Sequence, residues 1–313
     1  MSGGGLSRGD RTHVIFRGPE GPKPFWLSGM RGQGKQGVEL ANGLVGLDRP
    51  PTELVWLQEA RQNGADLVGS NVDVRTVKGA VNILGKTPRQ VRAAYDDWQR
   101  NNHFERYSRM FFINSYSGVR FLDVLLGASP DGSLDKDPAL LRRLVNYPWT
   151  WVAPNPYYKG YTETFRAKTL GSGDEFVRIK VRNFGSAPRV YPRIYLPGPG
   201  VWHIPRGTRQ PNWRGEENLG PLVEDDMIPL PAIKSGEGIW LNPDPRIETI
   251  TRVDANDPAN TAKEKNLWAQ MSGQRPKLWL NPRSQETWKF RCVGGVGGRE
   301  AKMVVQPLYL TFW

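Results

Sequence analysis

Residues 177–200 read VRIKVRNFGSAPRVYPRIYLPGPG, and this stretch is the clearest guide to the fold. Two runs, in which apolar residues alternate with cations or tyrosines, flank a turn segment that contains glycine and proline. A period of two is typical of a strand with one buried and one exposed face, so the stretch predicts a hairpin. The cations predicted to lie on its exposed face are Arg178, Lys180, Arg182, Arg189 and Arg193.

Neither run contains an acid to balance these cations. Like charges directly opposite one another in a sheet destabilise it by up to about 1 kcal/mol. One interpretation is a solvated face on which the tyrosines and the register keep the cations apart. The other, our hypothesis, is that acids from a neighbouring strand or subunit meet this face. All five cations are therefore interface candidates.

The remaining pattern predicts a mainly β protein. After residue 160, short apolar segments recur between clusters of Gly, Pro, Asn and Asp, which is typical of an antiparallel sandwich. Residues 205–227 and 254–275 are longer insertions, and the second is expected to hold a helix over 261–271. The last strand, expected over 303–312, is very apolar.

One helix is predicted among the strands of the first half. Thr87 is a suitable N-cap, and Pro88 occupies the first helical position. The apolar side chains that follow at helical spacing are Val91, Ala94, Tyr95 and Trp98. They form one stripe, so we expect this helix to pack on a sheet.

The expected organisation has four parts. Residues 1–12 are predicted to be flexible, 13–154 to form an N-terminal β domain with one packed helix, and 155–300 to form the sandwich with its insertions. Residues 301–313 are expected to form a C-terminal strand, and its return to the N-terminal domain is a hypothesis.

The composition argues against several classes of function. The net charge is +12, but the cations are spread along the chain without a basic block or a finger motif, which argues against dedicated nucleic-acid recognition. The one cysteine, Cys292, is expected to be a buried thiol that shares a strand face with Trp288 and Phe290. No apolar run is long enough to span a membrane, so we expect synthesis in a cytoplasm without membrane insertion.

No motif predicts an enzyme. Residues 32–37 match GxGxxG by letter, but prolines precede them and no long helix follows, so a loop is the better interpretation. Residues 254–258 resemble a calcium loop only faintly, because Pro258 occupies a ligand position. We therefore expect no catalytic residue, no cofactor and no metal. A glycoside hydrolase is the weakest of the function classes, since no pair of acids stands out.

Four motifs in order resemble one family. They are APNPYY at 153–158, NFGSAP followed by YPRI at 183–194, SGEGIWLN with DPR at 235–246, and LWLNPRS at 278–284. These segments are similar to the linker, hairpin and strand motifs of siphophage distal tail proteins. The two insertions resemble those of the larger minor tail proteins of actinobacterial phages.

The resemblance implies a structural virion protein at the phage tail tip, made in the host bacterial cytoplasm. Its N-terminal domain would form a homohexameric ring, and a galectin-like sandwich would project outward. The ring would join the tail tube to the tail-tip hub, the tape measure and other minor tail proteins. It would leave a channel for DNA ejection, with Arg31 and Lys35 as candidates for lining the lumen or contacting the tube.

An alternative function is a carbohydrate-binding module that recognises glycans on the host surface. Galectin-like sandwiches can bind sugars, and exposed tryptophans stack on them. Trp202 and Trp213 are the candidates for such stacking. The same tryptophans are more often part of a core or an interface.

Overall fold

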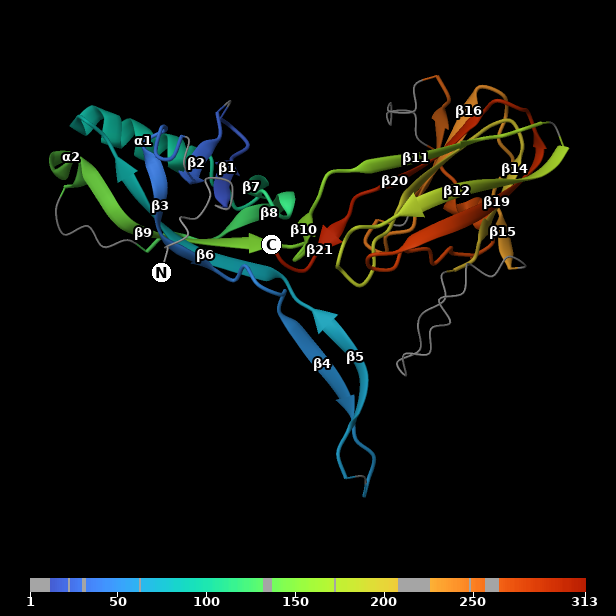
Figure 1. Ribbon diagram of the computed structural model, residues 1–313, viewed down its shortest axis with the longest axis horizontal. Coiled ribbons are helices and arrows are strands. Elements are labelled where there is room, and N and C mark those ends of the chain that lie inside the picture. Colours follow the sequence, from blue (N-terminus) through green and yellow to red (C-terminus); the bar gives the residue numbers. More distant parts are fainter. Residues whose placement is uncertain are drawn as a thin grey trace, which may run out of the picture. The chain divides into compact units, whose positions relative to one another are not determined.

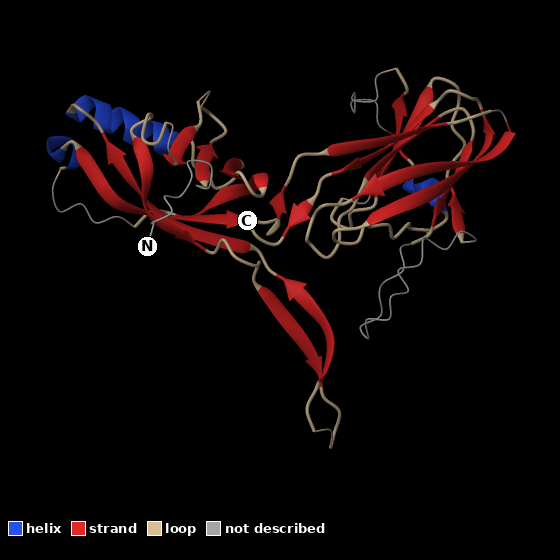
Figure 2. Ribbon diagram, viewed as in Figure 1, coloured by secondary structure: helices blue, strands red, loops and turns tan. Residues whose placement is uncertain are grey.

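The computed structural model describes residues 12–21, 23–29, 32–61, 63–131, 137–171, 173–207, 226–247, 249–256 and 265–313. The chain is 52% strand and 8% helix, which confirms the mainly β class (Figure 2). It divides into unit 1, Met1–Gly160 with Tyr309–Trp313, and unit 2, Tyr161–Leu308. The segment expected to be flexible, 1–12, lies outside the described residues except for its last residue.

Unit 1 is built on one long antiparallel sheet. Its strands run in the order β2-β1-β7-β8-β9-β6-β3, and β10 pairs with β8 off this path. Their bounds are β1 His13–Arg17, β2 Phe25–Ser28, β3 Val38–Val45, β6 Arg75–Leu84, β7 Ser108–Asn114, β8 Gly118–Ala128, β9 Arg143–Ala153 and β10 Tyr158–Lys159. A further two-residue strand, β21 Leu308–Tyr309, pairs with β10.

Helix α1, Pro88–Arg100, covers this sheet as the apolar stripe predicted (Figure 1). The Thr87 hydroxyl accepts a hydrogen bond from the backbone N–H of Gln90 at 3.3 Å, which caps the first turn. Trp98 is fully buried, and its ring packs against Phe16 and Phe25 with centroid distances of 4.9 and 5.1 Å. A second, shorter helix, α2 Pro138–Leu141, precedes β9.

Two strands of unit 1 leave this sheet. β4, Thr52–Leu57, and β5, Asp66–Val72, pair only with each other and form a separate two-stranded sheet. This β4–β5 hairpin extends away from the rest of unit 1 (Figure 1). The sequence predicted a β domain over this region, but not that two of its strands form an arm.

Unit 2 is a sandwich of two antiparallel sheets, as expected. The larger sheet runs β11-β20-β13-β16-β17-β18 and the smaller runs β12-β19-β14-β15. Their bounds are β11 Glu163–Lys168, β12 Gly173–Arg182, β13 Arg193–Pro197, β14 Val201–Pro205, β15 Met227–Pro229, β16 Glu237–Asn242, β17 Thr249–Asp254, β18 Lys265–Asn266, β19 Gln285–Gly295 and β20 Glu300–Val305.

The hairpin expected over 177–200 is not formed. β12 pairs with β19 in one sheet, whereas β13 pairs with β16 and β20 in the other. The connection crosses between the two layers of the sandwich, because each apolar face is needed in the shared core. Tyr195, expected on the exposed face, is consequently buried at 4% exposure.

Two further expectations differ in detail, and a third falls mostly outside the described residues. The division falls after Gly160 rather than after 154, and β20 pairs inside unit 2, so only Tyr309–Trp313 belong to unit 1. The region of the expected helix 261–271 is described only from residue 265, where it contains a 3-10 turn, Trp268–Met271. The insertion at 205–227 lies mostly outside the described residues.

The expectation for the cysteine is confirmed. Trp288, Phe290 and Cys292 are all fully buried on β19. Burial raises the pKa of the Cys292 thiol to about 11, so it stays protonated at neutral pH. Among the described residues, no helix has the length and apolar character needed to cross a membrane.

Candidate functional site

The β4–β5 hairpin presents an exposed apolar surface in unit 1. Trp56, Leu57, Leu67 and Val68 have exposed fractions of 56%, 54%, 56% and 63%. Trp56 lies directly opposite Leu67 across the strand pair. A two-stranded hairpin alone in water is marginally stable at best, so these side chains mark a surface that another element covers.

Arg75 anchors the base of this hairpin. It begins β6, and its side chain is fully buried. Its guanidinium donates to the carbonyl oxygens of Gly46 at 2.8 Å and Pro156 at 2.7 Å, and also to that of Asp48. Arg75 itself follows the hairpin, while Gly46 and Asp48 precede it. The side chain therefore ties together the two chain segments at the base of the hairpin, and it also holds Pro156, which lies shortly before the chain enters unit 2.

The same guanidinium reaches the C-terminal segment. It donates to the Leu310 carbonyl at 3.1 Å, and its carbon lies 4.7 Å from the centroid of the Tyr158 ring. Burial lowers the pKa of Arg75, while Tyr158 and Asp48 act in the opposite direction, and the group remains charged. Its positive charge is satisfied by carbonyl dipoles and a ring face rather than by a contacting carboxylate.

Arg120, on β8, holds the end of the chain. Its guanidinium donates to the carbonyl of Thr311 at 2.7 Å and to that of Trp313. Its carbon also lies 4.0 Å from the centroid of the Tyr309 ring. Phe312 is buried in the core of unit 1, so the last five residues are a structural part of that unit.

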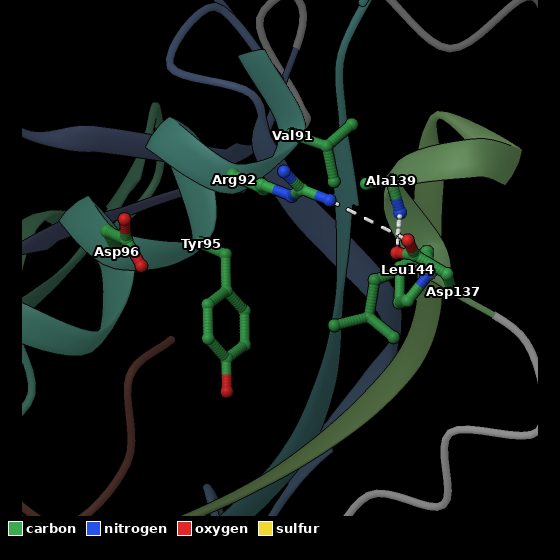
Figure 3. Close-up of a pocket in the computed structure, with 8 residues that line it drawn as sticks. Val91, Arg92, Tyr95, Asp96, Asp137, Ala139 and Leu144 are labelled. Carbon is green, nitrogen blue, oxygen red and sulfur yellow. Dashed lines mark hydrogen bonds and ion pairs between the residues drawn. The ribbon is translucent and has the colours of Figure 1, made fainter. Parts of the chain in front are cut away.

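A pocket of about 260 Å³ lies between α1, α2 and β9. Figure 3 shows Val91 and Tyr95 of α1 on one side and Ala139 and Leu144 on the other. The Arg92 guanidinium lies 3.7 Å from the Asp137 carboxylate at the rim. Sites for small-molecule ligands have volumes of about 300–1,000 Å³, so this pocket better fits a single side chain.

Apolar side chains surround the pocket. Leu140 of α2 is 76% exposed, and Leu141 and Val145 are each 51% exposed. Exposed cations on α1, at the start of β9 and beside the two helices include Lys86, Arg89, Arg142 and Arg143. None of these four has a side-chain partner within the described residues. We call this surface of α1, α2 and the start of β9 the α1–α2 face.

The five predicted interface cations do not form one surface. Arg178, Lys180 and Arg182 are exposed on β12, whereas Arg189 and Arg193 belong to the connection and to β13. Their exposure agrees with the prediction, but their distribution over two sheets does not. Whether any of them contacts another subunit remains a proposal.

Three of these cations have partners inside the chain. Arg182 forms an ion pair with Glu163 of β11 at 3.2 Å, so an acid of another strand in the chain balances this cation. The guanidinium carbons of Arg189 and Arg193 lie 5.0 and 4.9 Å from the ring centroids of Trp279 and Trp240. Within the described residues, Arg178 and Lys180 have no such partner, and Arg178 lies opposite Lys289 on β19.

One group of charges on the sheet of unit 1 is paired internally. Asp123 of β8 accepts from Arg109 at 2.6 Å and from Lys159 at 2.7 Å. Burial alone would raise the pKa of Asp123, but the hydrogen bonds from Arg109 and Lys159 outweigh it, and the net pKa is lowered. Asp123, Arg109 and Lys159 thus balance one another within unit 1.

The remaining predicted residues are dispersed. Lys35 is exposed in the turn between β2 and β3, and Arg31 lies outside the described residues. Trp202 is fully buried, and its indole N–H donates to the carbonyl of Pro197 at 2.7 Å, so it is not available to stack on a sugar. Trp213 lies outside the described residues.

Sequence reasoning missed the hairpin surface and the α1–α2 face. The signal for the first was present, because Leu54-Val-Trp-Leu57 is a continuous apolar run rather than an alternating one. Such a run predicts a strand covered on both faces. The α1–α2 face carries no comparable signal, since exposed leucines in a short helix look like core residues in the sequence.

Sequence comparison finds two phage proteins. The chain is 23% identical over 309 residues to Minor tail protein Gp27 of Mycobacterium phage D29, covering 83% of this chain and 88% of that protein. It is 23% identical over 310 residues to Minor tail protein Gp27 of Mycobacterium phage L5, with the same coverage of 83% and 88%. No protein-family model matches the chain.

Structure comparison finds the same fold in tail-tip proteins. The SPP1 Dit (gp 19.1) protein, described as a hub of the adsorption apparatus in phages that infect Gram-positive bacteria, aligns with a TM-score of 0.57 at 9% identity. That alignment covers 96% of this chain and all of that one. A chain of the phage P2 baseplate aligns with a TM-score of 0.52 at 8% identity, covering 95% and 98%.

These relatives and neighbours are components of phage tails and baseplates, not enzymes. The chain is therefore related to these mycobacteriophage minor tail proteins and shares the fold of the SPP1 Dit protein and of the phage P2 baseplate chain, which supports a structural tail protein.

Proposed function

We propose that the chain forms a homohexameric ring at the distal end of the tail and leaves a channel through which DNA is ejected. The ring joins the tail tube to the tail-tip hub, the tape measure and the other minor tail proteins. Support comes from the sequence relatives, which are minor tail proteins, and from the Dit fold, whose SPP1 example is described as a hub.

The β4–β5 hairpin is the observation that carries this proposal. Its apolar side chains are exposed on an arm that, within the residues the structure describes, pairs with no other strand. Closed rings use heterologous contacts, in which one patch of a subunit meets a different patch of the next. An arm that projects from unit 1 suits such a contact.

The basic residues have places within this proposal. Arg178 and Lys180, which lack partners among the described residues, are candidates for contacting acids of a neighbouring tail protein. Lys35 and Arg31 are candidates for the lumen or the tube contact, where a few cations guide phosphates without reading sequence. The protein is made in the host cytoplasm and ends in the virion at the tail tip.

No specific observation favours the carbohydrate-binding alternative. Trp202, one of its two stacking candidates, is part of the sandwich core. A glycan array remains the direct comparison, and a sugar-specific signal that Trp213→Ala removes would support it.

The test is the mass and shape of the assembled protein. Light scattering at several concentrations and negative-stain imaging would be applied to the chain alone and to the chain expressed with its tail-tube and tail-tip neighbours. We expect a six-fold ring with an open centre. A chain that stays monomeric in both preparations would contradict the proposal.

A further inference from the structure

The hairpin is both apolar and acidic. Between residues 52 and 73 it carries the carboxylates of Glu53, Glu59, Asp66 and Asp73 and only one cation, Arg61, in a chain whose net charge is +12. The apolar residues lie among these acids, with Leu57 directly opposite Asp66. Its complement is a surface that combines an apolar recess with uncompensated positive charge.

The α1–α2 face has these properties. It contains the pocket lined by Val91, Tyr95 and Leu144, and the exposed Leu140 and Leu141 extend the apolar area around it. Lys86, Arg89, Arg142 and Arg143 add positive charge at its edge and have no side-chain partner within the described residues. Its acids are Asp96, Asp97 and Asp137, and the last two pair with Arg100 and Arg92.

Size selects the residue that fills the pocket. An indole buries about 150–250 Å², more than other side chains, and tryptophan is enriched at the centre of interfaces. Trp56 is the one tryptophan of the hairpin and is 56% exposed. A recess of about 260 Å³ fits one aromatic side chain of this kind.

The hairpin does not cover this face within its own chain. Figure 1 shows it extending from the other end of β6, away from α1 and α2. Its base is fixed by Arg75 through the carbonyls of Gly46 and Asp48, which limits how far the arm can swing. An arm that covers this face would therefore have to come from a second copy.

We propose that the β4–β5 hairpin of one copy docks on the α1–α2 face of the next, with Trp56 in the pocket and the hairpin acids beside the free cations. The contact is heterologous, because two different patches of unit 1 meet, so repeating it closes a ring or extends a filament. This inference rests on the proposed ring and names its contact.

Disulfide trapping tests the geometry. The double variant Leu57→Cys with Leu140→Cys places one thiol on the arm and one beside the pocket, and the buried Cys292 does not interfere. We expect oxidation to give a ladder of covalent oligomers in non-reducing gels. The matched control, Leu57→Cys with Tyr116→Cys, uses a residue that is 94% exposed elsewhere on unit 1 and should give no ladder.

Affinity provides the second readout. Trp56→Ala should weaken self-association at least about thirtyfold, as expected for a central aromatic anchor. Tyr116→Ala should leave it unchanged, and added salt should weaken the wild-type association because opposite charges meet. All measurements use the preparation in which the wild-type chain assembles.

The outcomes separate the two proposals. A ring that forms without the 57–140 ladder, and that Trp56→Ala does not weaken, would overturn the docking contact and leave the ring in place. A wild-type chain that never assembles, even with its tail neighbours, would contradict the ring and the contact together.

Discussion

β4 and β12 are both exposed strands of an antiparallel pair, yet their sequences differ in kind. In β12 the apolar Val177, Ile179 and Val181 alternate with cations, so one face lies in the core and the other in solvent. In β4 the run Leu54-Val-Trp-Leu57 is apolar at every position, and all of it is exposed. The first strand is complete within its chain, whereas the second is not.

The difference shows how to interpret exposed strands. An alternating pattern predicts that one face of the strand is buried, and in β12 that face does lie in the core. A continuous apolar pattern predicts that both faces are buried, but in β4 both faces are exposed. Among the described residues nothing supplies this cover, which is the physical basis for both proposals above.

The largest expected effect contrasts two tryptophans. Trp288→Ala removes a fully buried ring opposite Ile179 of β12 and should lower the free energy of unfolding by about 3–5 kcal/mol. Trp56→Ala should change it by less than about 0.5 kcal/mol, because the ring is exposed in the single chain. Urea unfolding of the monomeric chain measures both, and equal losses would break the comparison.

The next effect tests how the hairpin is anchored. Arg75→Met leaves the carbonyls of Gly46, Asp48, Pro156 and Leu310 without their donor and should cost about 2–4 kcal/mol. It should also speed hydrogen exchange at the base of β4 and β5. Arg75→Lys keeps the positive charge but not the planar guanidinium, so it should recover only part of the stability that Arg75→Met loses. Wild-type stability of Arg75→Met would show that the anchor is dispensable.

A smaller effect concerns paired charge. The pKa of Asp123 is lowered in the folded chain, so its contribution is complete above the unfolded pKa of about 3.9 and is lost as the pH falls through the folded value. Asp123→Asn should cost roughly 1–2 kcal/mol at neutral pH and nothing in strong acid. The measurement is the free energy of unfolding of both proteins from pH 7 to pH 2. A difference between wild type and Asp123→Asn that stayed constant over this range would contradict the prediction.

The smallest effect concerns charge without a partner. Arg178 faces Lys289 across β12 and β19, so Arg178→Thr should raise the free energy of unfolding by up to about 1 kcal/mol, and more at low salt. Arg182→Thr is the matched control, because it removes the pair with Glu163 and should stabilise nothing. A loss of stability in Arg178→Thr would mean that the β12 cations are satisfied within the chain.

Local patterns that need only their own segment were predictable. The cap and stripe of α1, the buried thiol of Cys292 and the sandwich follow from spacing, because helix and strand periods decide which side chains share a face. The pairing of β12 was not predictable. Residues 177–182 and 189–196 look like a hairpin by sequence, but the choice of partner depends on which sheet completes the core.

By itself, the sequence determined the class of fold, the position of the main helix and the apolar run in β4, since each is set by neighbours along the chain. Only the tertiary structure decided that β12 and β13 lie in different sheets, that Trp202 is core, and that Arg75 joins four distant carbonyls. It also decided that the described part of the chain leaves Trp56 56% exposed. Burial depends on how the whole chain packs. A local pattern can therefore predict that a side chain is buried, but not which element buries it.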